Sequence, residues 1–155
     1  MNLDPADIRL LHALQLDAQL TTHELGEKLG LSPSQAGRRR QRLETEGYIR
    51  HYTARLSPEK LELDVQAFIQ VQMASQTPED ARDFLQLVRA RQEIVSAWTL
   101  TGDADYLLRV YTHDLARLNL LIHDVLLPHG AVARVQSQIV MDQPKADAGL
   151  PVQRV

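Results

Sequence analysis

Residues 21–47 read TTHELGEKLGLSPSQAGRRRQRLETEG and predict two helices joined by a short turn. Thr21 and Glu24 have the three-residue spacing of a capping box, which places the start of the first helix here. Gly30 ends this helix in the way that a left-handed cap does. A new helix begins almost at once after that glycine, so the connection between the two is very short.

The second helix of the pair starts at Ser32, with Pro33 behind it and Gln35 three residues on. It runs to about Glu46, where a glycine follows and stops it. Two helices joined so closely form a helix-turn-helix. A preceding helix over residues 4–17 completes an N-terminal domain that we expect to be winged-helix-like.

Positive charge gathers on the second helix of this pair. The whole chain carries a net charge of −3 at pH 7, but residues 32–50 hold five arginines against two glutamates. A phosphate backbone responds to such a local patch and not to the net charge of the protein. An arginine run can also be an ordinary solvated helix face. Its place on the second helix of a helix-turn-helix favours DNA binding.

The arginines of this run cannot all face DNA, because four consecutive residues span roughly 300° of a helix. Arg38 and Arg42 are one turn apart, and Arg39 lies near their face. Arg40 aligns with the apolar side, so we expect its stem to be packed and its guanidinium to reach Glu44 or Glu46. Ser34 and Gln35 should lie nearest the bases. The predicted DNA-binding set is Ser32, Ser34, Gln35, Arg38, Arg39 and Arg42.

A different pattern begins after residue 62. Apolar and polar residues alternate over 65–73, as in a half-buried strand, and further strands are predicted over 94–101, 106–111 and 132–141. Helical patterns starting at Thr77 and at Asp114 separate these strands. The order β-α-β-β-α-β predicts a ferredoxin-like domain with helices on one face of an antiparallel sheet. The chain is therefore of the α+β class.

These patterns suggest a division of the chain into four parts. Residues 1–49 form the helix-turn-helix domain, 50–62 a linker strand and turn, 63–141 the ferredoxin-like domain, which we also expect to mediate oligomerisation, and 142–155 a C-terminal tail. One chain has no third layer to cover the second face of the sheet. A second copy of the chain is the simplest cover, so we expect at least a homodimer.

At this point the sequence resembles a known family. Leu31-Ser32-Pro33-Ser34, then Arg38-Arg39, Arg42-Leu43-Glu44 and Gly47-Tyr48-Ile49 look like the helix-turn-helix of the Lrp/AsnC (leucine-responsive/asparagine-regulator) family. Residues 101–108, TGDADYLL, look like the signature of its ligand domain. The resemblance covers about residues 3–141. It implies a transcriptional regulator that forms dimers, often assembled into octamers, and binds double-stranded DNA.

The resemblance also implies an amino acid or related metabolite as effector, bound between dimers. The turn at Gly102 allows close backbone approach, and its amides could receive a carboxylate while Asp103 or Asp105 holds an ammonium group. The same residues could serve the hairpin turn alone. Val135 and Gln138 stand where the family is expected to have threonine or serine. The predicted effector-binding set is Gly102, Asp103, Asp105, Tyr106, Gln136, Ser137 and Gln138.

The sequence gives little support for an enzyme, a metalloprotein or a membrane protein. The chain has no cysteine, no phosphate loop, no nucleophile with a matched base, and no helical pair of histidines spaced for zinc. We therefore expect no enzyme, no catalytic residue, no metal and no cofactor. The absence of a long apolar run or signal peptide favours a cytoplasmic protein without a membrane partner. The remaining alternative is an architectural protein that compacts DNA without an effector.

Overall fold

A computed structural model describes residues 3–75 and 77–152, which divide into two compact units. The helical unit takes the residues up to Arg55 together with those from Pro144 onward. The sheet unit takes Leu56–Gln143. Within the described residues, no helix is both long enough and apolar enough to cross a membrane.

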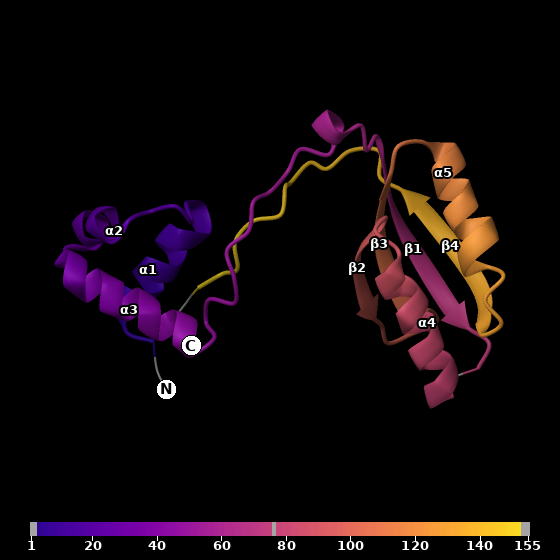
Figure 1. Ribbon diagram of the computed structural model, residues 1–155, viewed down its shortest axis with the longest axis horizontal. Helices are drawn as coiled ribbons and strands as arrows, with labels where there is room; N and C mark the ends of the chain where they lie inside the picture. Colours follow the sequence, from indigo (N-terminus) through magenta and orange to yellow (C-terminus); the bar gives the residue numbers. More distant parts are fainter. Residues whose placement is uncertain (1–2, 76, 153–155) are drawn as a thin grey trace. The chain divides into compact units, whose positions relative to one another are not determined.

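The helical unit contains α1 (Pro5–Leu16), α2 (Thr22–Leu29) and α3 (Pro33–Thr45), which are labelled in Figure 1. Each helix begins at a capping box whose side chain accepts a backbone N–H. The caps are Asp4, Thr21 and Ser32. Gly30 closes α2 in the left-handed region, with φ of 67°. The predicted helix-turn-helix is confirmed.

A leucine core holds the three helices together. Leu10, Leu25 and Leu43 are fully buried and come from α1, α2 and α3 in turn. At Gly26, a Cβ atom would lie 2.7 Å from the carbonyl oxygen of Leu31. Only a residue without a side chain lets α2 approach the turn this closely, so the turn holds α3 at a defined distance from α2.

The segment between the two units differs from the prediction. No strand forms within residues 50–64. The one element there is the short 3-10 helix η1, Glu59–Leu61. The sequence predicted a linker strand within 50–62 because of its β-forming residues. A strand needs a partner for its backbone groups, and none of the described strands pairs with this segment.

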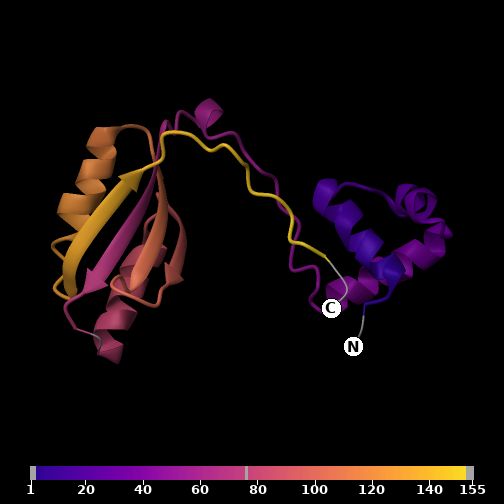
Figure 2. The same ribbon diagram turned by 180° about the vertical axis from the view of Figure 1, so that it is seen from behind.

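The sheet unit has the predicted β-α-β-β-α-β order (Figures 1 and 2). Its elements are β1 (Val65–Met73), α4 (Pro78–Ala90), β2 (Ile94–Thr99), β3 (Tyr106–Thr112), α5 (Leu115–Leu120) with its π-helical continuation η2 (Leu121–Leu126), and β4 (Val132–Ile139). The strands lie in the order β2-β3-β1-β4, and every neighbouring pair is antiparallel. The ferredoxin-like fold is confirmed.

The two faces of the sheet differ in character. Ala67, Ile69 and Leu108 are fully buried under α4 and α5, where Phe84 and Leu118 complete the core. The opposite face, here called the open face, has no covering layer among the described residues. By strand register it carries Gln66, Phe68, Gln70, Gln72, Ser96, Trp98, Leu107, Arg109, Tyr111, Arg134, Gln136 and Gln138.

The buried residues of the last helix do not keep a regular α-helical spacing. Leu115 at the start of the helix is exposed, whereas Leu118, Leu121 and Leu126 are buried. The spacing of five residues between Leu121 and Leu126 spans a wide π-helical turn, in which Leu127 donates to the carbonyl of Ile122. A turn of this kind rotates the residues that follow it relative to a regular α-helix.

Candidate DNA interface and effector pocket

The N-terminal end of α3 is held by reciprocal hydrogen bonds. The Ser32 hydroxyl accepts from the Gln35 N–H at 3.2 Å, and the Gln35 side-chain oxygen accepts from the Ser32 N–H at 3.0 Å. Ser34 is exposed beside them. The sequence predicted that Gln35 lies near the bases. In the structure its side-chain oxygen accepts a hydrogen bond within the helix cap, whereas the Ser34 side chain is exposed.

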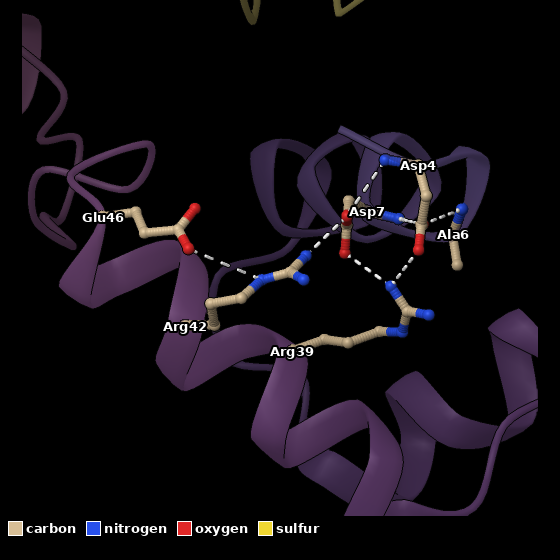
Figure 3. Close-up of polar contacts among 6 residues, drawn as sticks. All are labelled: Asp4, Ala6, Asp7, Arg39, Arg42 and Glu46. Carbon is tan, nitrogen blue, oxygen red and sulfur yellow. Dashed lines mark hydrogen bonds and ion pairs between the residues drawn. The ribbon is translucent and has the colours of Figure 1, made fainter. Parts of the chain in front are cut away.

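The arginines of α3 have different partners, and two of them pair with acids at the start of α1, Asp7 and the capping residue Asp4 (Figure 3). Arg39 contacts Asp4 at 2.5 Å and Asp7 at 2.7 Å, and Arg42 contacts Asp7 at 2.5 Å. We call Asp4, Asp7, Arg39 and Arg42 the Asp7 clamp. The Asp7 side chain is only 1% exposed, so its negative charge is buried against the two guanidinium groups.

Asp4 has two roles in the clamp. One carboxylate oxygen accepts the backbone N–H groups of Ala6 and Asp7 and caps α1, while the other accepts from Arg39. The backbone N–H of Asp7, followed by the Arg39 side chain, lowers the pKa of Asp4 to about 2. The hydrogen bond to Asp4 in turn raises the pKa of Arg39.

Arg40 lies as the sequence predicted, packed with its guanidinium beside Glu44. The distance from Arg40 Nε to the Glu44 carboxylate is 3.1 Å. Arg40 also donates to the carbonyl of Leu20 and to the Tyr52 hydroxyl, each at 3.0 Å. This residue therefore ties α3 to the segments before α2 and after α3, and it does not point outward.

Arg38 is the arginine of this run that points outward. Its side chain is exposed, and no ion pair links it to another described residue. Ser34, Arg38 and Gln41 follow one another at helical spacing and are all exposed, so they share the outward face of α3. A depression of about 340 Å³ adjoins this face and is lined by Leu31, Gln35, Arg38, Arg39 and Arg42.

Two features of this surface were missed from the sequence. Gln41 follows Arg38 by three residues, a spacing that places both on one side of a helix. The second feature is Asp7, whose pairing with α3 was not predicted. It precedes the buried Leu10, Leu11 and Leu14 at spacings of three, four and seven, so it lies on the apolar stripe of α1. An acid on such a stripe needs a cationic partner.

The predicted effector set is brought together only in part. Asp103 and Gln136 line a small pocket of about 50 Å³, together with Gln70, Gln72, Ala104 and Arg134. Gly102 lies next to Asp103 in the turn, with φ of 115°, in the left-handed region. Gln138 shares the open face with Gln136 through their pairing with β1. These four predicted residues therefore lie on the open face or at its edge.

The other three predicted residues have different surroundings. The Asp105 carboxylate accepts the backbone N–H of Met73 at 2.7 Å, which ties the turn to the end of β1. Tyr106 is buried and packs against Phe84, with ring centroids 5.0 Å apart and the ring planes tilted by 38°. Ser137 pairs with Ile69, on the helix-covered side of the sheet. None of the three lines the pocket.

The described part of the chain does not indicate a metal-binding site. No group of three or more histidine or acidic side chains there is placed to hold an ion.

Comparison with family models matches both halves of the chain. Residues 3–44 match the AsnC-type helix-turn-helix domain, and residues 66–150 match the Lrp/AsnC ligand binding domain. The first match covers α1, α2 and most of α3. The second covers the whole four-stranded sheet apart from the first residue of β1.

Named bacterial regulators are similar to this chain over most of its length. The Bkd operon transcriptional regulator of Pseudomonas aeruginosa is 35% identical over 139 residues, covering 90% of this chain and 91% of that protein. The leucine-responsive regulatory protein of Escherichia coli is 31% identical over 144 residues, covering 93% and 88%.

Solved structures of transcriptional regulators also match the chain over most of its length. A transcriptional regulator from Neisseria meningitidis, described as an L-Met complex, is 40% identical with a TM-score of 0.92, covering 96% of each chain. An AsnC family regulator from Agrobacterium tumefaciens is 33% identical with a TM-score of 0.89, covering 96% of this chain and 97% of its own. The resemblance seen in the sequence is confirmed: the chain belongs to the Lrp/AsnC family of transcriptional regulators.

Proposed function

We propose that this chain regulates transcription by binding double-stranded DNA through the outward face of α3, without a catalytic role of its own. The observation that carries the proposal is Arg38, an exposed guanidinium on the second helix of a helix-turn-helix. In this motif the exposed face of the second helix enters the major groove. Because the partner is DNA, the proposed place of action is the cytoplasm.

The N-terminal turn of α3 supplies the neighbouring contacts. Ser32 and Gln35 hold the helix end, whose positive dipole favours a phosphate. Ser34 and Arg38 lie one turn apart and can contact base edges, with the arginine fork suited to guanine. Arg39 and Arg42 already pair with the buried Asp7, so this proposal gives them no base or phosphate.

The test is Arg38→Ala in the full chain, with binding measured on a duplex selected by the parent protein from a random-sequence pool. A base contact predicts a loss of ~1–3 kcal/mol and a relaxed preference at one position of the duplex. A phosphate contact predicts equal weakening on all sequences and a salt dependence reduced by about 0.9 in slope. Arg82→Ala, an exposed arginine of α4, is the control and should bind like the parent. Parent-like affinity of Arg38→Ala would refute the assignment.

We further propose that an amino acid or related metabolite modulates this regulator at the pocket beside Gly102. The pocket contains one acid and one base, Asp103 and Arg134, which suit the ammonium and carboxylate groups of a zwitterion. Gln136 offers a neutral donor and acceptor next to them. The Neisseria meningitidis relative, whose structure is described as an L-Met complex, supports an amino-acid ligand. Since about 50 Å³ is too small for an amino acid, the proposal places the ligand between copies of the chain.

Calorimetry against the twenty amino acids tests this second proposal. At least one amino acid should release or absorb heat with the parent, and Asp103→Ala should weaken its binding by removing the partner of the ammonium group. Asp83→Ala removes an exposed acid from α4, away from the pocket, and should leave binding unchanged. No heat with any amino acid, or equal binding by Asp103→Ala, would contradict the proposal. The first result would favour an architectural protein without an effector.

We also propose that the chain is a homodimer, with an octamer as a further assembly. The open face supports this, because Phe68, Trp98 and Leu107 lie on it without a covering layer in the described chain. Trp98 remains 44% exposed in the single chain. A second sheet packed on this face would bury these side chains.

A further inference from the structure

The Asp7 clamp joins two helices that are distant in sequence. Asp7 receives the backbone N–H of Asp4 and both guanidinium groups, and its side chain is 1% exposed. A buried carboxylate is strongly unfavourable unless charged partners compensate it. The clamp therefore exists only when α3 presents Arg39 and Arg42 toward α1.

This requirement fixes the rotation of α3 about its own axis. Arg39 and Arg42 are three residues apart and lie on neighbouring turns, so two separate points of α3 are held against one carboxylate. Arg38 directly precedes Arg39 and points about 100° away around the helix. Any rotation that turned Arg38 away from its present direction would pull the two guanidinium groups off Asp7.

We propose that Asp7 is a positioning residue for DNA recognition, which aims Arg38 and Ser34 by holding Arg39 and Arg42. The inference rests on the proposed DNA-binding function and deepens it. Arg39 and Arg42 then contribute to DNA binding through Asp7 and make no phosphate contact of their own. This reverses the reading of the sequence, which assigned both arginines directly to DNA.

The rival explanation is that the two arginines leave Asp7 for phosphates when DNA arrives. That exchange would leave a carboxylate that is 1% exposed without its charged partners. It would also free α3 to rotate at the moment when Arg38 must be held in place. Both consequences favour positioning over exchange.

Salt dependence separates the two explanations. Binding of the full chain to the selected duplex is measured over a range of salt for the parent, Asp7→Asn, Arg39→Gln and the double variant. Positioning predicts that each single variant loses affinity by ~5- to 150-fold, the loss expected for one misplaced base-reading arginine. The salt slope of Arg39→Gln should equal that of the parent, and the double variant should bind no worse than the weaker single variant.

A direct phosphate contact predicts a different result, which would overturn the inference. The slope of log K against log salt would then fall by about 0.9 in Arg39→Gln. Its loss would also add to that of Asp7→Asn in the double variant. If the parent bound no duplex at all, the proposed function itself would fail, so the two failures are distinguishable.

A purely structural role of the clamp is tested by discrimination. Positioning predicts that Asp7→Asn loses more affinity for the selected duplex than for an unrelated duplex of equal length. Simple loss of folded protein lowers both affinities by the same factor and would contradict the inference. Circular dichroism gives the folded fraction. If Asp7→Asn does not fold, Asp7→Glu keeps the charge, displaces it by one methylene group, and should show the same loss of discrimination. Parent-like discrimination by Asp7→Glu would overturn the proposal.

Discussion

The Asp4 carboxylate both caps α1 and pairs with Arg39 of α3, so one group connects the two helices. Its pKa of about 2 in the folded chain lies below the ordinary 3.8, chiefly because of the Asp7 N–H and the Arg39 guanidinium. A group with a depressed folded pKa stabilises the protein above its unfolded pKa. That contribution is lost as the pH falls toward the folded pKa. The relevant window therefore lies between about 3.8 and about 2.

We predict that Asp4→Asn makes the stability of the helical unit less dependent on pH within this window. Asparagine also caps helices well, so the substitution removes the charge while keeping the cap. Denaturant unfolding followed by circular dichroism measures the free energy of unfolding at each pH. The parent should lose stability more steeply than Asp4→Asn as the pH falls. Asp83→Asn, an exposed acid outside the clamp, should follow the parent. Identical pH profiles for the parent and Asp4→Asn would contradict the prediction.

At the scale of elements, signals that are local in sequence predicted the structure well. Each capping box joins residues three apart, so Thr21 with Glu24 and Ser32 with Gln35 could be recognised without any knowledge of the fold. The alternation over 65–73 predicted β1 to the residue, because one of its faces is buried and the other is not.

Features that depend on distant partners were not predictable in the same way. Asp7 and Arg39 are separated by 32 positions, and their pairing requires the packing of α1 against α3. Asp103 and Asp105 lie in one turn and look alike in the sequence. One lines the pocket, whereas the other accepts the N–H of Met73 across the sheet. The linker formed no strand because a strand is defined by pairing, which composition alone does not supply.

The open face gives a prediction about assembly. Leu107 lies between Gln70 and Trp98 across neighbouring strands, in the middle of this face. We expect Leu107→Lys to shift the proposed dimer toward monomers, because burying an unpaired ammonium group between two sheets is strongly unfavourable. Light scattering after size exclusion measures the mass. Leu115→Lys alters an exposed leucine of α5, away from the open face, and should keep the dimer. A dimer of parent strength in Leu107→Lys would exclude this face as the interface.

At the scale of the whole chain, its last described residues return to the helical unit. The sequence predicted a tail here, and residues 146–152 contain no helix or strand. Their backbone is nevertheless held, because the Gln15 side chain both accepts from the Leu150 N–H and donates to the Leu150 carbonyl. Arg55 donates to the carbonyl of Asp147, and Val152 packs against the leucine core. The tail thus packs against the helical unit that contains α3.

We therefore predict that a chain ending at Gln143 has a less stable helical unit than the full chain. The hydrogen bonds of Gln15 to the tail are exposed, so Gln15→Ala should cost the full chain at most about 1 kcal/mol. The same substitution should cost nothing in the shortened chain, where its partner is missing. Hydrogen–deuterium exchange of the α1 amides measures both effects, since faster exchange reports a lower free energy of local opening. The sheet unit serves as the internal control, and exchange in β1 should be unchanged. Equal α1 exchange in the full and shortened chains would show that the tail contributes no stability to the helices.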